Sequence, residues 1–100
     1  MAFFKLEHLT NLYDGYRQTF SINGLSLLLI QDEGQRYLFL NQCPHQQAPL
    51  SNGTVTKGEI HCAYHGMRFN LQTGSTLDGC NERIQFFTLA YEGSSLGVDI

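Results

Sequence analysis

The sequence has no tryptophan, only 2 prolines and few charged residues. Charged side chains make up 15% of its 100 residues, with 6 Lys and Arg against 9 Asp and Glu, so the net charge is −3. The basic residues are scattered and never form a run. Because nucleic-acid binding needs a concentrated basic surface, this composition argues against nucleic acid as a partner.

The N-terminal segment, residues 1–8, lacks an apolar run long enough for a signal peptide or a membrane span. We therefore expect a soluble, cytoplasmic protein without a membrane partner. No repeat, linker or low-complexity stretch divides the chain, and its length suits one domain over residues 1–100.

Sustained helical periodicity is absent too, and only residues 9–13 hint at a short helix. Asn23-Gly24 lies between the apolar segments 16–22 and 25–31, which predicts a β-hairpin. A turn at residues 32–34 leads into a third strand-like segment, 36–40. Late strands are predicted at residues 84–90 and 96–100. These patterns predict an all-β fold, a compact sandwich or barrel.

Two short segments combine cysteine with histidine: Cys43-Pro44-His45, and Cys62-Ala63-Tyr64-His65 followed by Gly66. The spacing is C-x-H-x16-C-x2-H. Each pair follows a strand-like segment, so two turns can present two thiolates and two imidazoles to one metal site. A Rieske [2Fe–2S] centre uses this donor set, with two cysteines on one iron and two histidines on the other.

Two alternatives compete with an iron–sulfur site. The cysteines can be ordinary core thiols with histidines nearby, although two Cys–His pairs on turn-like segments make this less economical. Two Cys and two His also form a tetrahedral structural zinc site, and the chain would then be an interaction domain without redox activity. The C-x-H arm departs from the usual zinc spacing, which favours the iron–sulfur interpretation.

The sequence around both arms resembles Rieske-type ferredoxins. Residues 41–50 are similar to the family pattern N-x-C-P-H-x-G-A-P-L, and residues 62–74 to C-P-x-H-G-x-x-F-D…T-G. The resemblance implies an antiparallel fold of three small sheets with the cluster at one tip. It also implies that Cys43, His45, Cys62 and His65 bind one Rieske-type 2Fe–2S cluster.

The chain departs from the family pattern at several positions. Gln47 replaces a frequent glycine, Ala63 a proline and Asn70 an aspartate, and the segment 79–83 lacks proline. None of these changes affects a ligand.

Other positions bear on the redox potential. Ala48 and Tyr64 stand where respiratory Rieske proteins have a disulfide, and Met67 and Phe69 where those proteins place hydroxyl donors to sulfur. Fewer donors imply a low midpoint, on the order of −150 mV.

The resemblance implies a function as an electron carrier without an active site of its own. Such ferredoxins take one electron at a time from a flavin reductase and pass it to a terminal oxygenase, commonly one that hydroxylates aromatic rings. The small subunit of an assimilatory NAD(P)H nitrite reductase is the alternative within the same fold.

The remaining candidate residues have lesser roles. Cys80 is expected to be an unpaired thiol, in keeping with a reducing compartment. His8 and His61 are expected at the surface, with His61 pointing away from the site by strand alternation. Three carboxylates are expected around the tip, either as ordinary solvated groups or as groups that steer a basic partner: Glu59, Asp78 and Glu82.

Overall fold

The computed structural model describes residues 2–44, 48–64, 66–76 and 82–100. In these ranges the chain is all-β, as predicted, with nine strands and two short 3-10 turns. The elements are β1 (Phe3–His8), η1 (Leu9–Asn11), β2 (Arg17–Ile22), β3 (Leu25–Asp32), β4 (Gln35–Leu40), η2 (Leu50–Asn52), β5 (Thr54–Thr56), β6 (Glu59–His61), β7 (Arg68–Asn70), β8 (Leu89–Glu92) and β9 (Ser95–Asp99).

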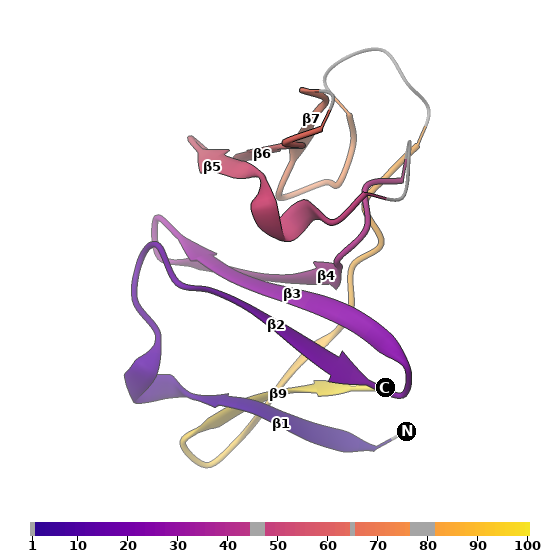
Figure 1. The fold of residues 1–100 in the computed structure, drawn as a ribbon. Coiled ribbons are helices and arrows are strands. Elements are labelled where there is room, and N and C mark those ends of the chain that lie inside the picture. The colour runs from indigo at the N-terminus through magenta and orange to yellow at the C-terminus, as the bar shows by residue number, and fades with distance from the viewer. Residues whose placement is uncertain (1, 45–47, 65, 77–81) are drawn as a thin grey trace.

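The strands form three antiparallel sheets of three strands each, ordered β1-β9-β8, β2-β3-β4 and β5-β6-β7. Figure 1 shows the β5-β6-β7 sheet at the end of the molecule away from both chain termini, with β2-β3-β4 between it and the terminal strands. No helix in the described ranges has the length and apolar character needed to cross a membrane.

The middle sheet consists of two tight hairpins that the sequence predicted. Asn23 and Gly24 have φ values of 52° and 79°, and Glu33 and Gly34 have 51° and 78°. Two successive residues with positive φ form the turn whose twist matches paired strands, which explains the preference for Asn-Gly at the first hairpin. β2 pairs with β3 from Arg17↔Ile30 to Ile22↔Leu25, and β4 continues the sheet without a register break.

β3 is buried on both faces and separates two hydrophobic cores. Leu27 and Leu29 point to one side, and Leu28 and Ile30 to the other; all four are at most 2% exposed. The first pair joins a group that we call the terminal core: Leu6, Tyr16, Leu27, Leu29, Leu38, Leu96 and Val98. The second pair joins a group that we call the cysteine core: Leu28, Ile30, Phe39, Cys43, Leu50, Ile60, Cys62, Phe69, Leu71 and Ile84.

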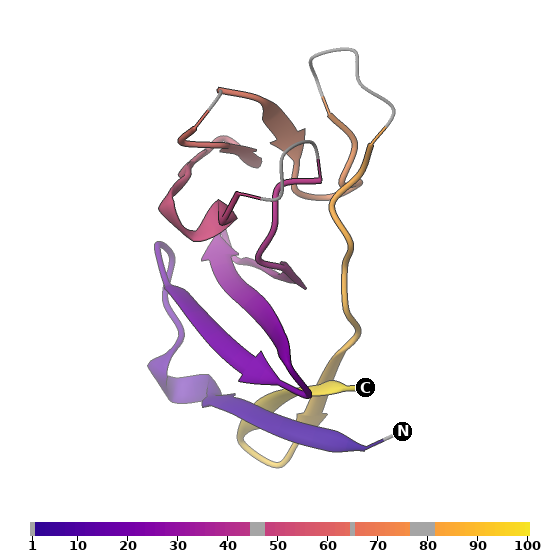
Figure 2. The same ribbon diagram turned by 45° about the vertical axis from the view of Figure 1, so that its right-hand side comes forward.

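The late part of the chain differs from the prediction. The expected strand over residues 84–90 is wrong for most of its length, because β8 begins only at Leu89. Residues 84–88 instead run along the edge of β4, where Leu40 N–H donates to Gln85 O at 2.8 Å and Phe87 N–H to Leu38 O at 2.9 Å. Figure 2 shows this segment passing from the region of β7 down to β8. It changes sheets on the way, so no continuous ladder forms.

The remaining elements agree with the sequence predictions to different degrees. β1 was not predicted, because its partner β9 lies at the opposite end of the sequence. The helical hint at residues 9–13 is only the 3-10 turn η1. The final strand, expected at residues 96–100, is β9 within one residue at each end. Phe86 is 37% exposed and contacts Phe39 edge-on at a centroid distance of 6.1 Å.

The Asp14 carboxylate ties the turn after η1 to the β3–β4 hairpin. Its Oδ1 accepts hydrogen bonds from Gly34 N–H at 2.9 Å and from Gln31 Nε2 at 3.1 Å. These bonds, the Gly34 bond first, lower the pKa of Asp14 below its ordinary value of 3.8. The stabilisation is therefore present above that value and is lost as the pH falls through the lowered pKa.

Asp14→Asn keeps an oxygen acceptor but cannot titrate. We predict that this variant loses less stability than the wild type as the pH falls. The unfolding midpoint should be measured in urea from about pH 6 to about pH 2 for both proteins. The two curves should converge as the pH falls below 3.8, where the wild-type carboxylate takes up its proton. Parallel curves over the whole range would contradict a stabilising role of the charged carboxylate.

Candidate metal centre

Cys43 and Cys62 belong to the same buried group of side chains. Cys43 is 0% exposed and Cys62 is 2% exposed, and both are part of the cysteine core. They arrive from different elements, since Cys43 follows β4 and Cys62 directly follows β6. The structure thus brings together the two thiols that the sequence assigned to one site.

The first arm is closed by a backbone hydrogen bond. Cys43 N–H donates to Ala48 O at 2.6 Å. Just before it, Asn41 Oδ1 accepts a bond from Ser51 N–H at 2.8 Å, and Asn41 Nδ2 lies 3.3 Å from Ser51 Oγ. Asn41 therefore connects the entrance of this arm to η2, beyond its exit.

The second arm is the tight connection between β6 and β7. Cys62 N–H donates to Met67 O at 2.9 Å, and Gly66 N–H donates to Cys62 O at 2.9 Å. Gly66 has a φ of 70°, a conformation that glycine adopts without steric cost. The backbone of this turn thus requires the glycine that follows His65 in the sequence motif.

The cysteine thiols are surrounded by apolar side chains. Ile60 and Phe69, which pair across β6 and β7, are both 0% exposed, as are Leu50 and Leu71. Met67 and Ala48 are partly buried and pack against this core. Such surroundings exclude water and provide an interior of low dielectric constant around the two sulfur atoms.

The predicted histidine ligands, His45 and His65, lie outside the described residues, and so do Gln47, Asp78 and Cys80. Within the described ranges, no three His, Cys, Asp or Glu side chains gather in a way that could hold a metal ion. The structure therefore covers the cysteine half of the predicted donor set. Two buried thiols on separate, hydrogen-bonded loops fit the cysteine half of a Rieske centre.

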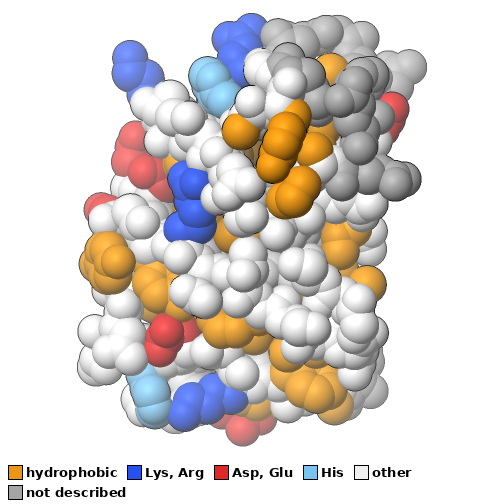
Figure 3. Space-filling view, in the orientation of Figure 1, with side chains coloured by type: hydrophobic (Ala, Val, Ile, Leu, Met, Phe, Trp, Pro, Cys, Tyr) orange, Lys and Arg blue, Asp and Glu red, His pale blue; other side chains and the backbone are white. Residues whose placement is uncertain are grey.

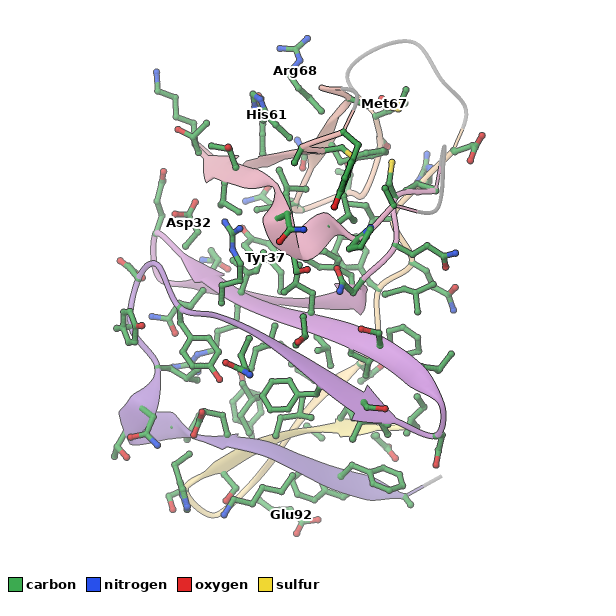
Figure 4. All side chains as sticks on the ribbon, viewed as in Figure 1. Asp32, Tyr37, His61, Met67, Arg68 and Glu92 are labelled. Atoms are coloured by element: carbon green, nitrogen blue, oxygen red, sulfur yellow. The ribbon has the colours of Figure 1, made fainter. Side chains whose placement is uncertain are left out.

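The other two histidines are placed as the sequence predicted. His8 is exposed, with Nε2 at 2.9 Å from Lys5 Nζ. The His61 side chain is 35% exposed, and its Nε2 lies 3.4 Å from Glu59 Oε1. Figure 4 shows His61 and Arg68 on the outer side of the β5-β6-β7 sheet. Ile60, the preceding residue of β6, is buried.

Two of the three proposed docking carboxylates can be placed. Glu59 Oε1 lies 3.4 Å from His61 Nε2, and Glu82 is exposed. Tyr64 was not predicted as an exposed group, yet it is 60% exposed and its hydroxyl accepts a bond from Asn52 Nδ2 at 3.2 Å. Figure 3 shows hydrophobic side chains reaching the surface at the end of the molecule that holds β5, β6 and β7.

Gly53 marks a close approach between the two arms. Its φ of −76° suits any residue, but a Cβ at this position would overlap the carbonyl oxygen of His61, directly before Cys62. No sequence pattern pointed to this role, because the contact joins the end of η2 to the backbone of β6. Here glycine is needed for space and not for its dihedral angles.

We predict that Gly53→Ala lowers the free energy of unfolding by about 1–3 kcal/mol, because the added methyl group forces β5 and β6 apart. Amide chemical shifts of His61 and Cys62 should change with it. Thr56→Ala is the control, since it changes an exposed side chain of β5 and adds no atom between β5 and β6. That control should leave these two amides in place; unchanged shifts in Gly53→Ala would contradict the steric argument.

Comparison with known proteins agrees with this geometry. Residues 2–87 match the family described as Rieske [2Fe-2S] domain. The chain is 31% identical over 84 residues to the ferredoxin component of the alkene monooxygenase system of Xanthobacter autotrophicus, covering 83% of this chain and 69% of that protein. It is 31% identical over 81 residues to the ferredoxin component of the naphthalene 1,2-dioxygenase system of Pseudomonas aeruginosa, covering 80% and 78%.

Two further similarities concern a larger protein and a solved fold. The chain is 32% identical over 71 residues to apoptosis-inducing factor 3 of Mus musculus, covering 71% of this chain but only 12% of that protein. The ferredoxin of carbazole 1,9a-dioxygenase from Nocardioides aromaticivorans superimposes with a TM-score of 0.84 at 24% identity, covering 98% of this chain and 97% of that one. The three-sheet fold is therefore that of a Rieske protein.

Proposed function

The chain belongs to the Rieske [2Fe-2S] domain family, and we propose from this premise that it is a ferredoxin, an electron carrier without an active site of its own. It would receive single electrons from a flavin reductase and deliver them to a terminal oxygenase of the ring-hydroxylating type. The observation that carries the proposal is the pair of buried cysteines in one core. Ferredoxin components of two oxygenase systems among its relatives support the assignment.

In this proposal Cys43 and Cys62 bind one iron through their thiolates, and His45 and His65 bind the other through imidazole nitrogens. When bound, the 2Fe–2S group supplies one-electron oxidation and reduction. The chain's own contribution is to hold the ligands and to keep water away from the two sulfurs, through Leu50, Ile60 and Phe69.

We further propose that residues 1–100 act as one Rieske domain in the cytoplasm. The family match ends at residue 87, but β9 pairs with β1 from Phe3↔Asp99 to His8↔Ser95. The last residues therefore complete a sheet that begins at the N-terminus. The partner proteins would dock transiently at the end of the molecule where the ligand arms lie.

Iron analysis and EPR spectroscopy test the proposed cofactor. After reduction with dithionite, the protein should contain two irons per chain and give a rhombic signal with an average g below about 2, as a Rieske centre does. One zinc per chain and no EPR signal would replace the electron carrier with a structural zinc domain.

Substitution of the histidines tests the ligand assignment. His45→Ala and His65→Ala should each abolish cluster incorporation, because either change removes a ligand to the second iron. His61→Ala is the control, since its ring faces Glu59 on the outer side of β6, and Cys80→Ala should also retain the cluster. Full iron and sulfide content in His65→Ala would overturn the assignment.

The midpoint potential should be low, on the order of −150 mV, because Met67 and Phe69 offer no hydroxyl donors to sulfur. Phe69 is 0% exposed and Met67 packs on the cysteine core. Met67→Ser should raise the midpoint in protein-film voltammetry, whereas Met67→Ala should not. A wild-type midpoint well above zero would contradict the argument.

A further inference from the structure

Arg17 reaches from the middle sheet to the chain segment that links the two ligand arms. It lies at the start of β2, and its Nη1 donates to Ser51 O at 2.9 Å and to Gly53 O at 2.5 Å. Ser51 lies in η2 and Gly53 directly follows it. One guanidinium nitrogen thus binds two successive parts of this turn.

The carbonyl groups at the end of a helical turn have no partner within the turn itself. In η2, the only internal bond to its C-cap runs from Gly53 N–H to Leu50 O at 2.9 Å. Arg17 supplies donors to the carbonyls of Ser51 and Gly53, and a charged donor makes a stronger hydrogen bond than a neutral one.

η2 is also where both ligand arms meet. Asn41, two residues before Cys43, accepts the Ser51 N–H at 2.8 Å. Gly53 lies against the carbonyl of His61, the residue before Cys62. Leu50, at the start of η2, is 0% exposed in the core that holds both cysteines. A displacement of η2 therefore moves the backbone next to each thiol.

We propose that Arg17 is a positioning residue for the iron–sulfur site: it fixes η2 to β2 and so keeps Cys43 and Cys62 at their spacing. This inference rests on the proposed function. β2 pairs along its whole length with β3, whose side chains are buried in both cores, so Arg17 ties η2 to the middle sheet. Its Nη1 bonds go to the carbonyl groups of Ser51 and Gly53, so its role is to position η2.

The test compares three variants as purified, cluster-loaded proteins. Arg17→Gln removes the charge and shortens the side chain, and Arg17→Lys keeps a charged nitrogen that can donate both bonds but lacks the planar guanidinium. Arg36→Gln is the matched control, because it removes an arginine from the same sheet whose Nε donates to Gln31 Oε1 at 3.0 Å. Cluster loss is followed by bleaching of visible absorbance under a chelator, and EPR line widths are measured after reduction.

Arg17→Gln should lose its cluster about fivefold faster than wild type, because two hydrogen bonds to charged nitrogen are lost, and its EPR lines should broaden. Arg17→Lys should be intermediate, and Arg36→Gln should match wild type in both readouts. If Arg17→Gln and Arg36→Gln unfold at the same temperature, the faster cluster loss of Arg17→Gln reflects lost positioning and not a general loss of stability.

Two outcomes distinguish the possible failures. If the wild type holds its cluster and Arg17→Gln behaves as Arg36→Gln does, Arg17 has no positioning role and the proposed function stands. If the wild-type protein contains no iron, the proposed function fails, and the positioning role fails with it.

Discussion

The structure depends on the burial of β3 on both faces. Consecutive residues of this strand serve two different cores, Leu27 and Leu29 below and Leu28 and Ile30 above, and none is more than 2% exposed. Fully burying a leucine or isoleucine side chain contributes about 1.5–3 kcal/mol. Because β3 contributes side chains to both cores, it fixes the two outer sheets relative to each other. A change of register by one residue would exchange the two sets of side chains, so both cores specify the same pairing.

The β5-β6-β7 sheet is stabilised by the cysteine core that packs against its inner face. β5, β6 and β7 have three residues each, and so short a sheet is marginal by itself. Its inner residues, Ile60 and Phe69, are completely buried only because β3, β4 and η2 close over them. Ligands bound to metal would add cross-links between the same segments, so cluster binding and the order of this sheet are expected to be coupled.

Local signals in the sequence predicted the fold class and the middle sheet, whereas long-range pairings needed the structure. Asn23-Gly24 and the turn before Gln35 identify their hairpins because turn chemistry is local. β1 and β9 pair across the whole chain, and no local pattern shows that. The stretch 84–88 has strand-like composition but changes sheets. For the site, spacing predicted two cysteines that the structure brings into one core; Gly53 and Arg17 act through distant backbone groups and leave no motif.

The distribution of hydrogen bonds around the site links its geometry to its redox chemistry. Asn41 and Arg17 are directed at η2, and the N–H groups of Cys43 and Cys62 are directed at Ala48 and Met67 carbonyls of their own arms. These bonds fix the loops, and each of the two cysteine N–H groups already has an acceptor. Donors to ligand sulfur are what raise a Rieske potential. The backbone donors of both arms thus hold the loops in place, beside the apolar side chains of Met67 and Phe69. In the proposed centre, the packing that orders the two loops would also set the surroundings of the ligand sulfurs.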